Sequence, residues 1–216
     1  MSSLRFRYQT LEFGNADIHV RSLRDNQQFS DDDDIALKLG ISSATWPLFG
    51  VVWASGEVLA HHMLNYEVAG LRVLEVGCGI GLASLVLNHR LADITATDYH
   101  PEAGNFLLEN VKLNSGKHIP FMRTGWADPD SGLGKFDLII GSDLLYERSH
   151  VETLSGFIEQ HANTQCTVIL VDPGRGHHAP FSKKMVTLGY THSQFKPTET
   201  VYLEKPFAGQ ILSYQR

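Results

Sequence analysis

Three glycines alternate in the loop at residues 77–81, which lies between two apolar segments, residues 71–76 and 82–87. A strand that runs into a glycine turn and then a helix is typical of nucleotide-binding loops, because a Cβ there would clash with a closely approaching ligand. The dinucleotide fingerprint G-x-G-x-x-G has its third glycine where this chain has Leu82. The loop therefore fits a nucleoside without a pyrophosphate better than NAD, and S-adenosylmethionine is the cofactor that this spacing favours.

An acidic residue suited to holding a ribose follows at the expected interval. The segment 93–98 alternates in polarity and ends in Asp98, about 20 positions after the first loop glycine, as in βαβ nucleotide-binding units. A carboxylate at this point can accept hydrogen bonds from both ribose hydroxyls. The alternative interpretation is that Asp98 caps a helix beginning near Pro101, since Asp and Pro both favour helix starts.

An acid and a tyrosine, Asp143 and Tyr146, follow another apolar run at residues 136–140. Strand ends meet at one edge of a parallel sheet, so both side chains should lie where a transferred methyl group would sit. Tyr146 could instead be an ordinary buried tyrosine, which would look the same in the sequence.

The elements that must position these residues are indicated by apolar periodicity. We expect strands at 4–9, 18–23, 71–76, 93–98, 119–123, 136–140 and 167–171 with two or three more in the tail to 213–214, and helices at 55–64 (capped by Ser55), 82–91, 101–114, 148–161 and 179–188. This order predicts an α/β fold: a Rossmann-like doubly wound sheet, mostly parallel, with an antiparallel C-terminal strand hairpin and a short N-terminal β extension. Side chains just past the strand ends should converge on one cleft, namely Gly77, Asp98, Trp126, Asp143 and Asp172.

Length and composition restrict the class of protein. The chain has 216 residues, of which 43% are hydrophobic. We therefore expect one domain, with residues 1–45 as the N-terminal extension and residues 46–216 as the catalytic core. A net charge of −6 argues against a general nucleic-acid binder. No apolar run approaches the roughly 20 residues of a membrane span, and the N-terminus lacks a signal-peptide core. The acidic run 31–34 is expected to be a solvated loop.

Cysteine and histidine usage favours a reducing compartment and no metal. Cys78 and Cys166 are interpreted as free thiols of a cytoplasmic protein. The histidine pairs 61–62 and 177–178 are poor co-ligands, because adjacent helical side chains point about 100° apart, and no Cys or carboxylate lies at zinc spacing. The turn cluster 172–176 contains Arg175, which is either a structural turn residue or a gate to the cleft.

Taken together, these segments resemble the class I, seven-β-strand methyltransferases that use S-adenosylmethionine, and within them the family 16 protein-lysine methyltransferases, marked by D-x-x-Y after strand four. The resemblance spans roughly residues 46–180, and its matching pieces are 51–56, 74–81, 97–101, Trp126 and 143–146.

This resemblance implies roles for individual residues. The loop glycines Gly77, Gly79 and Gly81 would approach the methionine part of the cofactor, and Asp98 would hold the ribose. Further cofactor contacts are implied for Trp53 at the methionine end, Trp126 against the adenine, Ser142 in the pocket wall, and Glu75 and Tyr99 within the matching pieces. Asp143 and Tyr146 would face the substrate amine. Because a carboxylate raises the pKa of a neighbouring ammonium, we assign Asp143 to orienting the amine and leave the amine's proton to water. The Tyr146 ring can hold a cationic amine by cation–π contact. Trp53 and Trp126 could instead be core aromatics.

The resulting hypothesis is an S-adenosylmethionine-dependent N-methyltransferase that acts on a lysine side chain of a protein. Two alternatives remain: a methyltransferase of the same fold with a small-molecule substrate, and a non-catalytic binding or scaffold protein that retains the fold. Methylation of nucleic-acid bases is disfavoured, because such amino-group enzymes resemble N-P-P-Y or D-P-P-Y after strand four, and here the two prolines are Leu144 and Leu145.

Overall fold

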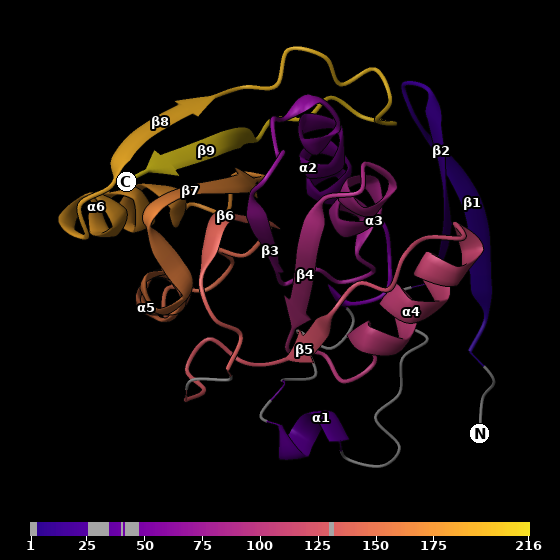
Figure 1. Cartoon of the computed structure of the whole chain (residues 1–216), viewed down its shortest axis with the longest axis horizontal. Coiled ribbons are helices and arrows are strands. Elements are labelled where there is room, and N and C mark those ends of the chain that lie inside the picture. The colour runs from indigo at the N-terminus through magenta and orange to yellow at the C-terminus, as the bar shows by residue number, and fades with distance from the viewer. Residues whose placement is uncertain (1–3, 26–34, 40, 42–47, 130–131) are drawn as a thin grey trace.

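The computed structural model describes residues 4–25, 35–39, 41, 48–129 and 132–216. Helices and strands alternate along most of this part of the chain (Figure 1). Their bounds are β1 Phe6–Phe13, β2 Ala16–Leu23, α1 Ile35–Lys38, α2 Ala54–Asn65, β3 Arg72–Val76, α3 Leu82–His89, β4 Asp93–Asp98, α4 Ala103–Leu113, β5 Phe121–Arg123, β6 Phe136–Ser142, α5 His150–His161, β7 Ala162–Asp172, α6 His178–Thr187, β8 Thr191–Phe195 and β9 Gln210–Gln215. The acidic run 31–34 lies outside the described residues.

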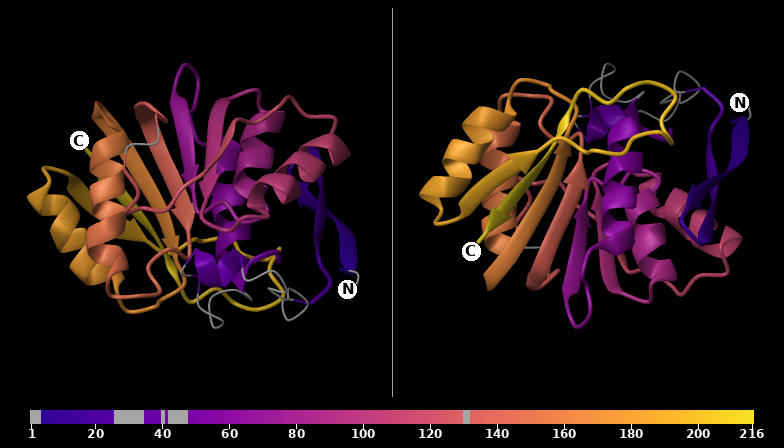
Figure 2. Two further views of the ribbon diagram at one scale, coloured as in Figure 1. Left: turned by 90° about the horizontal axis from the view of Figure 1, so that it is seen from below. Right: turned by 90° about the horizontal axis from the view of Figure 1, so that it is seen from above.

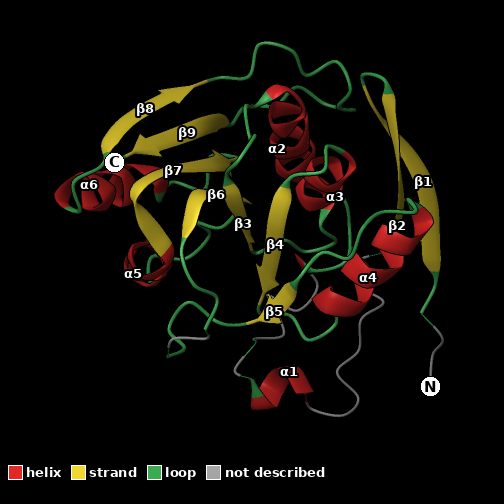
Figure 3. Ribbon diagram, viewed as in Figure 1, coloured by secondary structure: helices red, strands yellow, loops and turns green. Residues whose placement is uncertain are grey.

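A seven-stranded sheet with the order β5-β4-β3-β6-β7-β9-β8 forms the centre of the molecule (Figure 3). The strands from β3 to β7 pair in parallel, and β9 is antiparallel to both β7 and β8. The predicted doubly wound sheet with an antiparallel C-terminal hairpin is therefore confirmed. Strand order reverses between β3 and β6, and such a switch point is where ligands bind in open α/β sheets.

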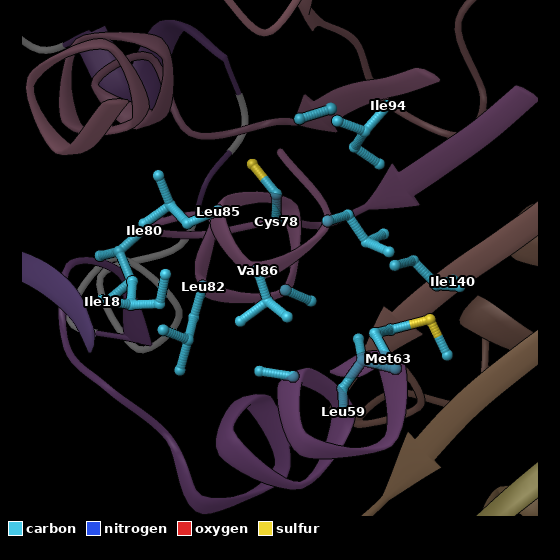
Figure 4. Close-up of a cluster of buried hydrophobic side chains, with 14 of the residues drawn as sticks. Ile18, Leu59, Met63, Cys78, Ile80, Leu82, Leu85, Val86, Ile94 and Ile140 are labelled. Carbon is cyan, nitrogen blue, oxygen red and sulfur yellow. The ribbon is translucent and has the colours of Figure 1, made fainter. Parts of the chain in front are cut away.

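Two hydrophobic cores lie on opposite faces of this sheet, because side chains alternate along each strand. In β6, Leu138 and Ile140 face one core and Ile139 faces the other. The first core packs beneath α2, α3 and α4, and Figure 4 shows Leu59 of α2 and Val86 of α3 within it. The second core packs beneath α5 and α6, on the other side of the sheet (Figure 2).

Residues 6–23 of the N-terminal extension form a hairpin that packs on the first core. β1 and β2 pair antiparallel up to Phe13 and Ala16, joined by the predicted turn at Gly14 and Asn15. Ile18 of β2 points into the core, and the Asn110 side chain of α4 accepts a hydrogen bond from the Arg21 backbone N–H at 2.7 Å. This hairpin is therefore packed against the sheet domain.

Several element boundaries differ from the prediction. Ser55 does not cap α2; it is buried in the first turn, and the helix starts from Trp53, whose carbonyl accepts from the Glu57 N–H at 3.0 Å. β7 begins at Ala162, five residues before the expected start. In the described part of the chain, no helix is both long and apolar enough to cross a membrane.

Candidate active site

A cavity of about 510 Å³ opens at the carboxyl edge of the sheet, beside the switch point. Its size is typical of small-molecule and cofactor sites. Ten of the residues singled out in the sequence line it: Trp53, Glu75, Gly77, Gly79, Asp98, Tyr99, Trp126, Ser142, Asp143 and Tyr146. Gly81 and Asp172 are not among the lining residues.

The glycine loop after β3 needs left-handed backbone at all three glycines, whose φ values are 62°, 57° and 79° for Gly77, Gly79 and Gly81. A Cβ at Gly79 would meet no described atom within 4 Å, which leaves its backbone open to the cavity. A Cβ at Gly81 would lie 2.4 Å from Leu107 Cδ1. Gly81 therefore permits the close packing of α3 against α4, which sequence spacing alone does not distinguish from ligand contact.

Asp98 ties the end of β4 to this loop. Its Oδ2 accepts from the Gly79 N–H and its Oδ1 from the His100 N–H, both at 2.7 Å. Burial raises the Asp98 pKa, and these backbone hydrogen bonds oppose the rise. The next helix begins at Ala103 with Glu102 at its N-cap position, so the alternative role of Asp98 as the cap of α4 is wrong.

Glu75 is a second buried carboxyl group in the wall of the cavity. Its Oε2 accepts from the Ser84 N–H at 2.8 Å and from the Ser84 hydroxyl at the start of α3. Burial raises the pKa of Glu75 to about 7, while the two Ser84 hydrogen bonds oppose the shift and the charge of Asp98 adds to it.

Three aromatic side chains, Trp53, Tyr99 and Tyr146, line the cavity although each is more than a third exposed, so they stand where it meets solvent. The Trp53 Nε1–H donates to the Leu48 carbonyl at 2.9 Å, and the Tyr99 hydroxyl donates to the Leu39 carbonyl. These bonds fix both rings at the rim. Neither ring belongs to the hydrophobic core, so the alternative interpretation of Trp53 as a core aromatic is wrong.

Tyr146 and Trp126 are linked through His150, the first residue of α5. The His150 ring meets Tyr146 edge-to-face at 4.4 Å and Trp126 at 4.9 Å between centroids. Its Nδ1 donates to the Leu144 carbonyl at 2.8 Å, which fixes the ring. Burial, followed by the charges of Asp98 and neighbouring acids, raises the pKa of Tyr146 to about 12, so its phenol is neutral over the range in which proteins are assayed.

Asp143 has an unusual backbone conformation, and its carboxylate forms a bidentate ion pair. Its φ is +53°, uncommon for a residue with a side chain, and its N–H donates to the Val171 carbonyl at 2.9 Å. The Arg175 guanidinium binds both carboxylate oxygens, with Nε at 2.9 Å and Nη2 at 2.7 Å. The carboxylate that we expected to face a substrate amine thus carries a bidentate ion pair.

The cavity is predominantly acidic. Its described lining includes one arginine, Arg175, and five acids: Glu75, Asp98, Asp128, Asp143 and Glu147. A cleft of one sign attracts ligands of the opposite sign, so this site favours a cationic ligand. Among the residues that the structure describes, there is no group of three or more His, Cys, Asp or Glu side chains arranged to hold a metal ion.

The expectation that Asp172 reaches the cleft is wrong. β7 continues through Asp172, which is 2% exposed and lies 3.2 Å from His178 Nδ1. The chain enters the cavity three residues later, at Arg175. His150 was not foreseen, and the only sequence signal for it is its position at the start of a predicted helix directly after the D-x-x-Y segment.

Comparison with known proteins identifies the family of this chain. Residues 33–183 match the model of a family described as lysine methyltransferase. The chain is 30% identical over 133 residues to the electron transfer flavoprotein beta subunit lysine methyltransferase of Mus musculus, covering 60% of this chain and 51% of that protein. It is 32% identical over 143 residues to protein N-lysine methyltransferase METTL21A of Danio rerio, covering 60% and 63%. The chain spans about half the length of the first of these relatives.

The solved structures share the fold. Magnesium protoporphyrin IX methyltransferase from Synechocystis, with bound S-adenosylmethionine, aligns with a TM-score of 0.62 at 19% identity over 88% of this chain and 99% of that one. At this identity the likeness concerns the fold alone. The family model, however, covers well over half of the sequence, including the glycine loop, Asp98 and the Asp143–Tyr146 segment. The chain therefore belongs to the lysine methyltransferase family.

Proposed function

We propose that this protein binds S-adenosylmethionine in the cavity and transfers the methyl group to a lysine side chain of a protein. The observation that carries the proposal is the convergence of two sets of residues on one acidic cavity. The glycine loop and Asp98 come from β3 and β4, whereas Asp143 and Tyr146 follow β6. The relatives named for protein-lysine methylation support the acceptor, and family membership supports the reaction.

The buried acids and open glycine backbone fit this cofactor, which supplies an electrophilic methyl group on a cationic sulfonium. Gly77 and Gly79 would lie beside its methionine part, and Glu75 and Ser142 line the same wall. Asp98 would accept from the ribose hydroxyls with lone pairs that its backbone donors leave free. Trp126, held by His150, offers a ring face for the adenine. Trp53 and Tyr99 would close the rim.

On the acceptor side, Asp143 would orient the amine and Tyr146 would flank it. An amine must be neutral to react, although the reference lysine pKa is about 10.4. Positioning is the main contribution available, because an in-line displacement needs two reactants held in line. The partly exposed aromatic rim fits a side chain delivered from a protein surface, since Tyr146 and Trp53 can contact the arriving cation through their ring faces.

We further infer a single domain, because the N-terminal hairpin packs on the same core as α3 and α4. A cytoplasmic location is supported by Cys78 and Cys166, which are buried and free, as expected in a reducing compartment.

Asp143→Ala tests the division between binding and chemistry. We expect transfer of labelled methyl groups to protein in a cell extract to fall by about a hundredfold or more, the usual scale for losing a positioning group. Affinity for S-adenosylhomocysteine, measured by calorimetry, should stay within a few-fold. Tyr146→Phe should lose less, because the ring remains. Full activity of Asp143→Ala would refute the assignment, and label found only in small molecules would favour a metabolite acceptor.

A further inference from the structure

We propose that Arg175 is a positioning residue that cancels the charge of Asp143, so that Asp143 can hold the acceptor amine without stabilising it as an unreactive ammonium. This inference rests on the proposed function and assigns a role to a loop residue outside the D-x-x-Y segment. In the proposed function, the carboxylate that orients the amine would also stabilise the amine's unreactive protonated form. A bare carboxylate beside an ammonium raises the ammonium pKa and therefore opposes the loss of the proton that methyl transfer requires.

The geometry of the pair removes this conflict. Arg175 Nε and Nη2 bind the two oxygens of Asp143 at 2.9 and 2.7 Å, so the carboxylate carries a fixed positive partner. Each carboxylate oxygen has two lone-pair sites, and a bidentate guanidinium uses one on each. Asp143 can therefore still accept a hydrogen bond from a neutral amine while the pair as a whole carries no net charge.

The loop that carries Arg175 is built to place it there. Gly174 and Gly176 flank it with φ values of 102° and 89°, a backbone region that other residues rarely adopt. The Arg175 N–H lies 3.4 Å from Asp172 Oδ1, which anchors the turn to the buried end of β7. On the other side, the N–H of Asp143 is fixed to Val171 of the same strand. Hydrogen bonds to β7 therefore hold both partners of the ion pair in place.

Other charged and titratable groups surround this pair. Asp98 at the end of β4, Tyr146 and Glu147 after β6 and His150 at the start of α5 line the same cavity. Asp172 at the end of β7 lies outside the cavity, close enough to act on Arg175, and His178 at the start of α6 contacts Asp172. The carboxylates in this set all favour an ammonium. Arg175 is the one lysine or arginine that lines the described part of the cavity. Its removal would therefore leave the amine among these carboxylates with no lysine or arginine in the described lining.

The charge of Arg175 affects how readily the substrate ammonium loses its proton. The substrate ammonium releases a proton to water before its nitrogen lone pair forms the bond to the methyl carbon, and in that step the carbon–sulfur bond breaks with its electron pair remaining on sulfur. Loss of one positive charge near the amine should raise the pKa of the bound amine by about one unit. Below that pKa the rate should then fall roughly tenfold.

Substitutions that separate charge from shape test this account. Arg175→Gln removes the charge, Arg175→Lys keeps it, and Arg148→Ala removes an exposed arginine of the neighbouring loop that forms no ion pair with a described residue. The pH dependence of methyl transfer to the protein labelled in a cell extract should move about one unit to alkaline pH in Arg175→Gln alone. An unmoved profile would show a merely structural role. Higher activity of Arg175→Gln at every pH would show that Arg175 blocks the amine site. Either result overturns the proposal.

A binding measurement decides the inference without turnover. With S-adenosylhomocysteine at saturation, n-butylammonium is titrated into each variant and followed by NMR. Arg175→Gln should bind this cation about tenfold more tightly than the parent, Arg175→Lys and Arg148→Ala should match the parent, and the affinity of all four for S-adenosylhomocysteine should agree within a few-fold. Equal n-butylammonium binding in Arg175→Gln and the parent would refute charge cancellation. If the parent labels no protein, the proposed function fails, and this titration still tests Arg175.

Discussion

Gly79 and Gly81 form a matched pair that separates the stability of the glycine loop from its ligand contacts. Both have positive φ, so alanine at either position costs roughly 1–2 kcal/mol of backbone strain. At Gly81 the new Cβ would also lie 2.4 Å from Leu107 Cδ1, in a side chain that is 1% exposed, and such overpacking adds about 1–3 kcal/mol. We therefore expect Gly81→Ala to lower the free energy of unfolding by about 2–5 kcal/mol, and Gly79→Ala by about 1–2 kcal/mol.

Urea denaturation and calorimetry check the two halves of this prediction. A difference of about 2 kcal/mol between the variants corresponds to roughly 4–8 °C in Tm for a chain of this size. Gly79→Ala should lose affinity for S-adenosylhomocysteine, because its Cβ would project into the cavity, whereas folded Gly81→Ala should retain affinity within a few-fold. Equal stability of the two variants, or equal loss of affinity, would refute the reasoning that assigns Gly81 to packing and Gly79 to the ligand.

Two buried carboxyl groups give further predictions. Asp98→Ala removes hydrogen bonds to both ribose hydroxyls and should weaken S-adenosylhomocysteine binding by about 2–4 kcal/mol in calorimetry; unchanged affinity in a folded variant would contradict the ribose assignment. For Glu75, burial raises the pKa from its ordinary 4.5 to about 7, so the folded state binds the proton more tightly and the free energy of unfolding should fall as pH rises from about 4.5 to about 7. Glu75→Gln should remove this fall and be more stable above pH 7 by roughly 2–3 kcal/mol, and denaturation at pH 5 and pH 8 that shows parallel changes in both proteins would exclude it.

Much of the sheet could be predicted from local patterns, because buried parallel strands are short apolar runs bounded by glycine or acid. The strand conformation of the segment 162–166 could not be predicted in this way. Its polar residues suggest a loop, yet they extend β7, because the backbone of Cys166 pairs with Arg216 at 3.0 and 3.1 Å and the Asn163 amide donates to Asp137 at 2.6 Å. These partners are distant in sequence. At its other end, β7 continues to Asp172, which pairs with Gln210 of β9; this pairing, between residues distant in sequence, keeps Asp172 in the strand and explains why that expectation was wrong.

Within the site, the spacing of motifs along the sequence was sufficient to predict that the glycine loop, Asp98 and Asp143 line one cavity, since all lie at strand ends. Spacing could not separate Gly81 from Gly79, because the distinction depends on Leu107 in another helix. It also left the role of Arg175 open between turn and gate. The ion pair with Asp143 joins loops after two adjacent strands, and only the pairing of β6 with β7 makes that contact possible.

Under the proposed function, a lysine side chain of a protein receives the methyl group. The most direct measurement incubates the parent protein and Asp143→Ala with methyl-labelled S-adenosylmethionine and a cell extract, isolates the labelled protein and hydrolyses it to amino acids. Label in methylated lysine, present with the parent and lost with Asp143→Ala, is the predicted result. Label recovered in another amino acid, or only in metabolites, would contradict the account.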